Sequence, residues 1–448
     1  MALTGIQIFK LLPKTNCGEC GVPTCLAFAM NLAAAKAELA SCPYISEESK
    51  AQLSEASAPP IRPVVFGAGD NIVKIGGETV LFRHEKTFVN KPGLAILISD
   101  AMASDEIAGR IKRFMELKYD WIGLVLRPEM IAVKNESGDT GKYEALVRKV
   151  MDETDAALIL ISSNVEALTA AVKVSAARLP LVYAATEGNS DALASLAKEY
   201  KCPLAARADN MDSLTALTNK LSAAGVKDIV LDSGARTVRR AFEDQVFLRR
   251  AALVQKNRSL GFPTITFPCE MTTDPMKEAL VASTFIAKYA GIIVLSDFQG
   301  ESVFPLLVAR LNIYTDPQRP MMMQQGIYPI GSPTEDSPVL ITTNFALTYF
   351  IVSGEIEASR VPSWLLVMDT EGLSVLTAWA AGKFVGDAIG QFVKKCGITE
   401  KVKHRKIVIP GFVAAVSGDL EEELGTEWEV KIGPREAAHL SPFLKMAI

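Results

Sequence analysis

Four cysteines near the N-terminus constrain this chain more than any other feature of its sequence. They are Cys17, Cys20, Cys25 and Cys42, spaced C-x2-C-x4-C-x16-C, and a proline follows the last one. Cysteines grouped in this way form either a metal site or a pair of disulfides. Residues 1–12 are too short for a secretion signal and lack a small-residue cleavage site, so we expect a cytoplasmic protein. Because thiols stay reduced in that compartment, a metal site is the better interpretation.

The spacing favours a [4Fe-4S] cluster over a zinc ion. Zinc sites built from four cysteines usually contain two C-x2-C pairs, and here only Cys17 and Cys20 have that spacing. A cluster often takes three thiolates from one loop and a fourth, followed by proline, from farther along the chain. Gly18 and Gly21 allow the loop backbone to approach the sulfides of a cluster. Zinc or a purely structural group of cysteines is the alternative.

Length and composition describe a globular chain of more than one domain. The 448 residues exceed one ordinary core, and 49% of them are hydrophobic while 22% are charged. The formal net charge of -4 gives no reason to expect binding to nucleic acid, which needs a basic surface. No apolar run reaches bilayer-spanning length, because Lys288 interrupts the best candidate, residues 281–295. We therefore expect contact with neither nucleic acid nor a membrane.

The pattern of apolar residues predicts an α/β protein with three domains. Residues 1–60 form the [4Fe-4S] domain with its linker, and residues 61–320 alternate short β-branched runs with amphipathic segments. This alternation is typical of a (β/α)8 TIM-like barrel, with a doubly wound open sheet as the alternative. The expected strands of the barrel are 94–98, 122–126, 158–161, 181–183, 203–205, 228–231, 264–267 and 292–295.

A hairpin, several helices and a connecting segment are expected around this barrel. A hairpin that turns at Gly76-Gly77 precedes the first strand. The expected helices of the barrel are 104–118, 164–178, 192–200, 213–224 and 276–289. Residues 301–338 contain many prolines and are expected to form an irregular connection to the last domain.

The last domain, residues 321–448, is predicted to be a smaller open α/β (Rossmann-like) domain. Its expected strands are 339–342, 364–368, 407–409 and 428–432. In open parallel sheets a ligand binds outside the carboxyl ends of the strands, where helix N-termini offer free backbone N–H groups. Ordinary strand–helix turns are the alternative explanation for the residues at these ends. The candidate cofactor-binding residues are Thr342, Thr343, Asn344, Ala346, Thr370, Glu371, Gly372, Leu373, Ser374, Gly411 and Gly433.

Conventional catalytic residues are scarce. The only histidines are His84, His404 and His439, which argues against a zinc hydrolase and against general-base catalysis by histidine. Acidic and amide residues follow the predicted strands of the barrel, but such residues commonly cap helices, so we assign no catalytic residue among them. These strand-end residues are Asp100, Glu129, Asn164, Glu187, Asn189, Asp209, Asp232, Glu270 and Asp297.

The three predicted domains, in this order, resemble one family over the whole chain. It is the large (gamma) subunit of the corrinoid iron–sulfur protein, part of the acetyl-CoA decarbonylase/synthase system. The most specific motif is residues 14–21, KTNCGECG, followed by PTC at 23–25. Residues 369–374, DTEGLS, look like the loop of this family that faces the corrinoid.

The resemblance implies a methyl carrier in the reductive acetyl-CoA pathway of carbon dioxide fixation. A bound cobamide in the Co(I) state would accept a methyl group from methyltetrahydrofolate through a separate methyltransferase, and would pass it to acetyl-CoA synthase. The four N-terminal cysteines would hold the [4Fe-4S] cluster that returns Co(II) to Co(I). The implied partners are a small corrinoid protein subunit, in a heterodimer, the methyltransferase and CO dehydrogenase/acetyl-CoA synthase. The chain would thus be the carrier component of a corrinoid-dependent methyltransferase system, of the transferase class.

The histidines bear on how such a corrinoid would be held. Many cobalamin-binding domains ligate cobalt through the histidine of an Asp-x-His-x-x-Gly motif, and none of the three histidines here lies in that motif. We therefore expect a corrinoid without a histidine ligand from this chain, which would make Co(II) easier to reduce. Two alternatives stay open. One is a ferredoxin-like electron-transfer subunit without corrinoid, and the other is a barrel methyltransferase that binds a pterin itself.

Overall fold

The computed structural model describes most of the chain, and its contacts divide the chain into two compact units. The described residues are 5–33, 37, 39–46, 48–50, 53, 59–316 and 319–447. The first unit comprises Met1–Lys118 and Arg127–Tyr314, and the second comprises Tyr119–Leu126 and Thr315–Ile448. Within the described ranges no helix has both the length and the apolar character needed to cross a bilayer. The domain boundaries expected at residues 60 and 320 stay predictions.

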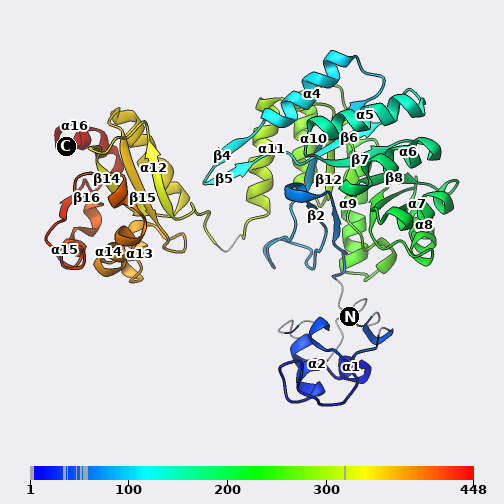
Figure 1. Ribbon diagram of the computed structural model, residues 1–448, viewed down its shortest axis with the longest axis horizontal. Helices are drawn as coiled ribbons and strands as arrows, with labels where there is room; N and C mark the ends of the chain where they lie inside the picture. Colours follow the sequence, from blue (N-terminus) through cyan, green and yellow to red (C-terminus); the bar gives the residue numbers. More distant parts are fainter. Residues whose placement is uncertain are drawn as a thin grey trace. The chain divides into compact units, whose positions relative to one another are not determined.

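The N-terminal part of the first unit is a small helical module that carries the four cysteines (Figure 1). It contains α1 (Gly5–Leu11), α2 (Cys25–Ala33) and the 3-10 turn η1 (Leu39–Ser41). The two helices pack together, and Ile8 and Phe28 form an apolar core with Cys25 and Cys42. The run of Ala, Leu, Phe and Met at residues 25–40 also predicts a helix. This helix is present as α2, and the rest of that range includes positions outside the described residues.

Eight parallel strands form the barrel of the first unit. They are β3 (Gly93–Ser99), β6 (Met130–Lys134), β7 (Ala157–Ile161), β8 (Leu181–Ala185), β9 (Leu204–Arg207), β10 (Ile229–Asp232), β11 (Ile265–Thr266) and β12 (Ile292–Leu295). Their order is β10-β9-β8-β7-β6-β3-β12-β11, and a parallel bridge between Leu231 and Thr264 joins the two end strands. The near-closed ring confirms the expected barrel. A doubly wound open sheet is wrong for this part of the chain.

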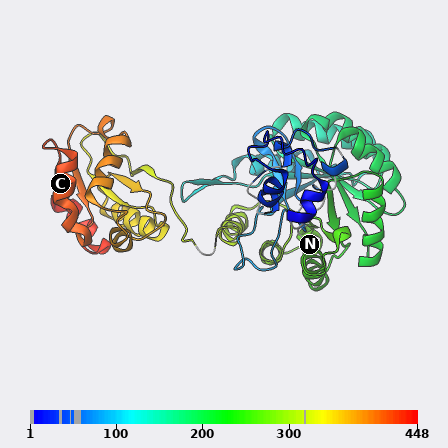
Figure 2. The same cartoon turned by 90° about the horizontal axis from the view of Figure 1, so that it is seen from below.

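Amphipathic helices cover the outside of these strands (Figure 2). They are α4 (Ser104–Glu116), α5 (Thr140–Glu153), α6 (Val165–Ser175), α7 (Ser190–Tyr200), α8 (Met211–Ala223), α9 (Val238–Leu253), α10 (Pro275–Ala287) and α11 (Gly300–Ile313). In α4, for example, Ile107, Ile111 and Phe114 are buried at helical spacing, which explains why one face of this helix packs on the barrel. Asn164 caps α6 by accepting from two backbone amides, so this strand-end residue is a helix cap.

One predicted strand of the barrel is wrong. Residues 122–126 belong to a hairpin formed by β4 (Tyr119–Trp121) and β5 (Leu124–Leu126), and Ile122 and Gly123 make its turn with φ angles of 49° and 75°. The barrel strand at this point is β6, which follows the hairpin. Glu129 therefore precedes a strand instead of following one, and both its carboxylate oxygens lie 2.8 Å from the guanidinium of buried Arg310.

Two further expectations are corrected at the edges of the barrel. Residues 301–338 are not irregular throughout, because they include most of α11 and the strand β13 (Gly326–Ile330). The expected hairpin exists, but β1 (Val64–Phe66) and β2 (Val73–Ile75) are joined through residues 67–72, and Gly76-Gly77 follows β2. Val64, Phe66 and Ile75 pack with the inward side chains of the barrel strands, so this hairpin closes one end of the barrel core.

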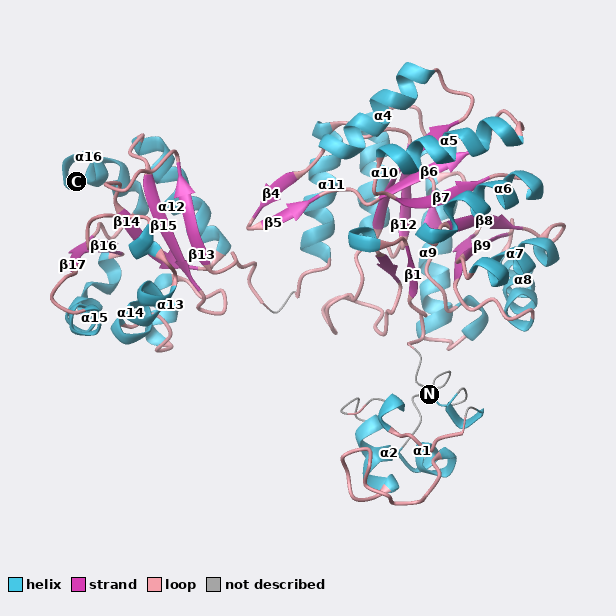
Figure 3. Cartoon of the chain, in the orientation of Figure 1, coloured by secondary structure: helices cyan, strands magenta, loops and turns pink. Residues whose placement is uncertain are grey.

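The second unit contains a five-stranded sheet in the order β13-β15-β14-β16-β17 (Figure 3). Its parallel strands are β14 (Val339–Thr343), β15 (Ser363–Met368), β16 (Lys406–Ile409) and β17 (Glu429–Ile432), and β13 is antiparallel to β15. Because β15 and β16 lie on opposite sides of β14, the strand order reverses between β14 and β16. This reversal is a topological switch point, where open α/β sheets bind ligands.

Helices pack on both faces of this sheet. They are α12 (Ala346–Ser359), α13 (Val375–Ala380), α14 (Gly386–Lys395), α15 (Ser417–Leu424) and α16 (Leu440–Ala447). Val339 and Ile341 of β14 pack in one core with α13, α14 and α15, while α12 and α16 pack against each other. The β4–β5 hairpin also belongs to this unit, because the ring of Trp121 lies 5.0 Å from the ring of Phe350 on α12.

Candidate functional site

The four N-terminal cysteines come from three neighbouring segments of the first unit. Cys17 and Cys20 lie in the loop between α1 and α2, Cys25 begins α2, and Cys42 directly follows η1. All four thiols are unpaired, so no disulfide connects them. Cys25 and Cys42 are buried in the same apolar core, Cys20 packs against that core, and Cys17 is exposed. These donors fit a [4Fe-4S] cluster, which takes four thiolates and needs no other ligand.

An iron–sulfur cluster and a single metal ion require different distances between their cysteine ligands. Among the described residues, no three His, Cys, Asp or Glu side chains stand close enough to hold one metal ion. In a cluster each thiolate binds a different iron atom, so the ligands lie farther apart than they do around zinc. Gly18 and Gly21 have φ angles of 78° and 83°, a left-handed conformation that favours glycine. The two glycines therefore explain how the loop turns between its cysteines.

At the carboxyl end of β14, Asn344 joins two loops of the second unit. Its side chain is 3% exposed, and its Oδ1 accepts hydrogen bonds from the amides of Thr370 and Gly372, each at 3.0 Å. Its Nδ2 donates to Oδ1 of Asp369 at 2.9 Å and to the carbonyl of Met323 at 3.4 Å. Asn344 thereby holds together the ends of β14 and β15. Its contact with a corrinoid stays a prediction.

The predicted loop after β15 is largely satisfied by its own chain. The amide of Glu371 donates to Asp369 Oδ1 at 2.9 Å, and the amide of Leu373 donates to the carbonyl of Thr370 at 3.3 Å. The Ser374 hydroxyl lies 3.0 Å from the hydroxyl of Thr377. These amides are thus engaged within the loop and are not free donors for a phosphate group.

A segment before β13 covers this side of the sheet. The amide of Ala346 donates to the carbonyl of Met321 at 3.0 Å, and the amide of Met323 donates to the carbonyl of Asn344 at 2.8 Å. Gly372, with a φ angle of 74°, lies so close to Met322 that a Cβ atom would stand 2.6 Å from its Cγ. The β14–β15 side of the carboxyl end is therefore closed by the chain itself.

The switch point between β14 and β16 is open instead. A cavity of about 130 Å³ lies there, which we call the switch-point cavity. Most of its lining is apolar and comes from both strands, from α12, from η7 (Gly411–Val416) and from the start of α16. Residues that line it include Thr342, Thr348, Val352, Phe412, Gly433, Arg435 and Leu440. The cavity lies where the strand topology predicts a ligand site.

Thr342 gives this cavity an unusual feature. The residue is 1% exposed, and its Oγ1 is buried without a hydrogen-bond partner. Thr343 is 0% exposed and its Oγ1 is likewise unpartnered, but this residue is not among those that line the cavity. Because buried polar groups are rarely left unsatisfied, each orphaned hydroxyl calls for an explanation. A ligand in the switch-point cavity could satisfy Thr342 and could not do the same for Thr343.

The structure brings together only part of the predicted set around this cavity. Thr342 and Gly433 line it, and Gly411 lies beside it, since a Cβ atom on Gly411 would stand 2.4 Å from the Gly433 carbonyl oxygen. Sequence reasoning missed the contributions of α12 and of residues 434–440. The apolar residues that follow Gly433 could have indicated that residues 434–440 pack near the cavity. This segment, however, is too short for its apolar residues to show a helical period.

At the carboxyl end of the barrel, strand-end residues bind one another. The Asp232 carboxylate accepts hydrogen bonds from Arg236 at 2.9 Å and from the Tyr183 hydroxyl, and the Arg236 side chain also binds Glu270. The guanidinium of Arg236 lies 4.6 Å from the ring centroid of Phe267. Burial raises the pKa of Tyr183 well above its usual value, and the nearby Asp232 raises it further. This mouth of the barrel is filled by a paired polar network.

Asp100, also at the carboxyl end of the barrel, likewise has its hydrogen bonds satisfied by neighbouring residues. Its two oxygens accept from the amides of Glu136 and Ser137 and from the side chains of Asn135 and Ser137, at 2.7–2.8 Å. Burial alone would raise the pKa of this carboxyl, but the hydrogen bonds lower it below the usual value. The side chain of Asp100 therefore has a structural task between β3 and β6.

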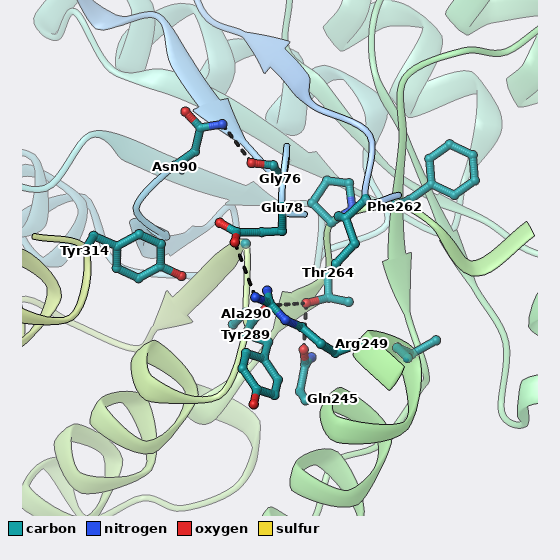
Figure 4. A pocket seen from close by; sticks show the side chains of 14 residues that line it. Gly76, Glu78, Asn90, Gln245, Arg249, Phe262, Thr264, Tyr289, Ala290 and Tyr314 are labelled. Carbon is teal, nitrogen blue, oxygen red and sulfur yellow. Dashed lines mark hydrogen bonds and ion pairs between the residues drawn. The ribbon is translucent and has the colours of Figure 1, made fainter. Parts of the chain in front are cut away.

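Another cavity, which contains polar side chains, lies at the opposite, amino end of the barrel (Figure 4). It measures about 30 Å³, and Glu78 and Arg249 face each other in it, with 3.3 Å between Oε2 and Nη2. The guanidinium lies 4.6 Å from the ring centroid of Phe88 and 4.4 Å from that of Tyr289. Burial raises the pKa of Glu78, although the positive charge of Arg249 opposes this effect. Because the amino end of such barrels serves stability, we assign this cavity a structural role.

Two families match this chain in adjoining regions. The family described as CO dehydrogenase/acetyl-CoA synthase delta subunit matches residues 63–444. A second family, described as a candidate Fe-S cluster domain, matches residues 12–44, which include all four N-terminal cysteines.

Curated relatives match along the whole length. The chain is 44% identical to the corrinoid/iron-sulfur protein large subunit of Moorella thermoacetica, covering 99% of each chain. It is 37% identical to the acetyl-CoA decarbonylase/synthase complex subunit gamma of Methanopyrus kandleri, covering 99% of this chain and 97% of that one. Among solved structures, Yersinia pestis dihydropteroate synthase with a pterine-sulfa conjugate is similar, with 15% identity and a TM-score of 0.37, over 50% of this chain and 95% of that one.

Proposed function

The chain belongs to the family of corrinoid/iron-sulfur protein large subunits and acetyl-CoA decarbonylase/synthase gamma subunits, and from this premise we propose that it carries methyl groups on a bound cobamide. When bound, the cobamide would supply a Co(I) nucleophile that takes a methyl group from methyltetrahydrofolate, through a separate methyltransferase, for delivery to acetyl-CoA synthase. The [4Fe-4S] cluster would supply the electron that restores Co(I) from Co(II). Cys17, Cys20, Cys25 and Cys42 would be its ligands.

The observation that carries the corrinoid part of this proposal is the buried, unpartnered hydroxyl of Thr342, a residue that lines the switch-point cavity. An apolar cavity with one buried hydroxyl suits the nucleotide tail of a cobamide, which presents an aromatic base beside a ribose and a phosphate. Thr342 would donate to a polar atom of that tail. Arg435, on the rim of the same cavity, would neutralise the phosphate charge.

The surface around this end of the sheet also suits a large, flat cofactor under a partner subunit. Large apolar side chains of the second unit are exposed there, and they come from the segments that follow or cover the strand ends. They are Met322 (38% exposed), Leu376 (46%), Trp379 (43%) and Phe412 (45%). Exposed apolar residues gathered at one site mark binding surfaces. A corrin ring and the small corrinoid subunit of a heterodimer would cover them.

The histidines support a cobalt without an imidazole ligand from this chain. Both ring nitrogens of His404 are engaged, since Nε2 lies 2.9 Å from the Ser337 carbonyl oxygen and Nδ1 accepts from the amide of Lys406 at 3.2 Å. His84 and His439 are exposed, and neither is among the residues that line the switch-point cavity. The Co(II) form should therefore show an EPR spectrum without nitrogen superhyperfine splitting from a histidine. Splitting that disappears in His439→Ala would contradict this assignment.

The barrel favours a supporting role over pterin binding by this chain. A pterin would have to enter the carboxyl end of the barrel, where Tyr183, Asp232 and Arg236 bind one another and the Asp100 oxygens already accept four hydrogen bonds. A polar ligand placed there would first have to break these bonds. Direct binding of methyltetrahydrofolate to the purified chain, without the methyltransferase, would favour the alternative of a pterin-binding barrel.

The test of this proposal uses the full chain made anaerobically with its small subunit in corrinoid-replete cells. We expect cobalt and iron in the purified complex, with the visible spectrum of a corrinoid. Thr342→Val should weaken retention of the cobamide about three- to tenfold, the cost of one lost hydrogen bond. The matched control is Thr343→Val, which removes the neighbouring orphaned hydroxyl and should leave retention unchanged. Iron without cobalt would instead indicate an electron-transfer subunit and would overturn the carrier assignment.

A further inference from the structure

Asn16, directly before the first cysteine, is distinguished by its backbone and by its side chain. Its φ angle is 48°, in the left-handed region that asparagine tolerates better than most residues. Its Oδ1 accepts a hydrogen bond from the amide of Cys25 at 2.8 Å, across nine positions of sequence. One residue thus fixes the turn that leads into Cys17 and also binds the backbone of Cys25.

The amide of Cys25 is one that would otherwise lack a partner. Cys25 is the first residue of α2, and the first amides of a helix have no acceptor within the helix itself. Thr24 satisfies a different amide, because its Oγ1 accepts from the amide of Ala27 at 3.1 Å. The side chains of Asn16 and Thr24 therefore accept hydrogen bonds from different amides at the start of α2. Thr24 stabilises the helix, whereas Asn16 connects the helix to the loop that holds Cys17 and Cys20.

The remaining cysteine segment is connected to the same loop from the other side. The hydroxyl of Tyr44 donates to Oε1 of Glu19 at 2.7 Å, and Glu19 lies between Cys17 and Cys20. Tyr44 is 52% exposed, so water can replace this bond at little cost. The partly buried bond made by Asn16 is therefore the stronger of the two connections.

We propose that Asn16 is a positioning residue for the iron–sulfur cluster, whose carboxamide holds Cys17 and Cys25 at the separation that a cluster requires. This inference rests on the cluster assignment made above. Residues 18–24 connect Cys17 to Cys25 along the chain, and they contain two glycines in left-handed conformations, so without the bond from Asn16 this connection is less constrained. The thiolates of Cys17 and Cys25 would then sample a wider range of separations, and a bound cluster would be released more readily.

Three substitutions separate the two features of Asn16. Asn16→Gly keeps the left-handed backbone accessible and removes the acceptor, whereas Asn16→Ala removes the acceptor and also strains the backbone. Asn16→Asp keeps an acceptor oxygen and adds a negative charge next to the cluster. The matched control is Thr24→Ala, which removes a cap of the same helix without touching the amide of a cysteine.

The experiment uses the full chain, purified anaerobically with its cluster. We expect Asn16→Gly to lose iron to a chelator about fivefold faster than wild type, the effect of one lost cap, and to broaden the EPR signal of the reduced cluster. Asn16→Asp should keep the wild-type rate and line shape while lowering the reduction potential, because the added charge disfavours the reduced state. Thr24→Ala should leave the EPR signal and the potential unchanged.

Two results would overturn the inference. Wild-type iron release and EPR line shape in Asn16→Gly would show that the carboxamide does not position the ligands. Equal changes in Asn16→Gly and Thr24→Ala would show that only the stability of α2 matters. If the wild-type chain itself bound no iron–sulfur cluster under these conditions, the cluster assignment would fail, and this outcome differs from either of the first two.

Discussion

Replacing Asn344 by alanine should destabilise the second unit through a single buried side chain. The Asn344 side chain is 3% exposed, and its Oδ1 is an acceptor for the amides of Thr370 and Gly372. Alanine leaves both amides without that acceptor in a buried position, because Thr370 and Gly372 are themselves buried. The Thr370 hydroxyl keeps one partner, because it also donates to the carbonyl of Leu373 at 3.1 Å. The hydrogen bonds lost in this variant are therefore mainly those of two backbone amides.

The expected size follows from these two donors. A buried donor left without an acceptor costs about 1–3 kcal/mol, and two donors that shared one oxygen should cost about 2–4 kcal/mol together. With a urea dependence of about 2 kcal/mol per M, the unfolding midpoint should fall by about 1–2 M. The loop that carries Glu371 and Leu373 would lose its attachment to β14 at the same time. Retention of a cobamide should consequently fall as well.

Tryptophan fluorescence measures this effect selectively. All four tryptophans, Trp121, Trp364, Trp379 and Trp428, belong to the second unit. A urea titration followed by their emission therefore reports on that unit while the barrel contributes no signal, which avoids the ambiguity of unfolding a chain of several domains. Circular dichroism on the same samples reports on both units, so it should show a transition that moves with the fluorescence and a barrel transition that does not move.

Two variants test the reasoning on the same loop. Glu371→Gln changes an exposed side chain paired with Lys383, and should shift stability by less than about 1 kcal/mol. Asn344→Asp keeps the acceptor oxygen but replaces the amide nitrogen that donates to Asp369 by a second carboxylate oxygen. Two carboxylates this close resist ionising together, so this variant should lose stability as the pH rises. If Asn344→Ala unfolded at the wild-type urea concentration, the central role of this side chain would be refuted.

Other substitutions give equally definite outcomes. Glu78→Gln leaves Arg249 buried without its counter-charge and should cost the barrel about 3–5 kcal/mol in thermal or urea unfolding. Because burial raises the pKa of Glu78, the wild-type barrel should lose stability as pH rises through that pKa, and Glu78→Gln should remove this pH dependence. Asp100 has a lowered pKa, so it stabilises the barrel above the usual carboxyl pKa and this contribution disappears as pH falls; Asp100→Asn should reduce the loss of stability in acid. Cys20→Ala should spare methyl transfer by pre-reduced protein and abolish reactivation of oxidised protein, and loss of both activities would contradict the role proposed for the cluster.

The barrel could be predicted from the sequence because its strands are buried on both faces. Runs such as 158–161 and 292–295 are continuously apolar, which is the pattern of parallel strands covered by helices. The run at 122–126 looks the same, yet Gly123 adopts a φ angle of 75° there and the run forms a hairpin. In this hairpin Ile122 is 5% exposed and Trp121 contacts Phe350, whereas Leu124 and Val125 are 37% and 63% exposed. A contact over more than two hundred positions leaves no local signal.

The residues of the candidate sites also differ in whether the local sequence reveals their task. The cysteines could be predicted because their chemistry is carried by residue type and spacing, which tertiary contacts do not alter. That Thr342 and Gly433 line a cavity agrees with their selection from the sequence, which rested on their places at the carboxyl ends of predicted parallel strands. The task of Asn344 could not be predicted, because the four residues that hydrogen-bond to its side chain come from two other segments, around Met323 and around Thr370. Such a network becomes visible only when the distances between loops are known.

The end of β14 would serve both the proposed ligand and the fold. Side chains alternate along a strand, so Thr342 faces the switch-point cavity and Thr343 faces away from it, while Asn344 lies just beyond and joins the loops. A register shift of one residue would turn Thr342 away from the cavity and bring Thr343 toward it. The pairing of Thr342 with Val367 on β15 sets the register, and Asn344 secures it by binding the loop that follows β15 directly. The structural bonds of Asn344 therefore determine which hydroxyl a cobamide would meet, so the two residues should act together in retention of the cofactor although only Thr342 lines its cavity.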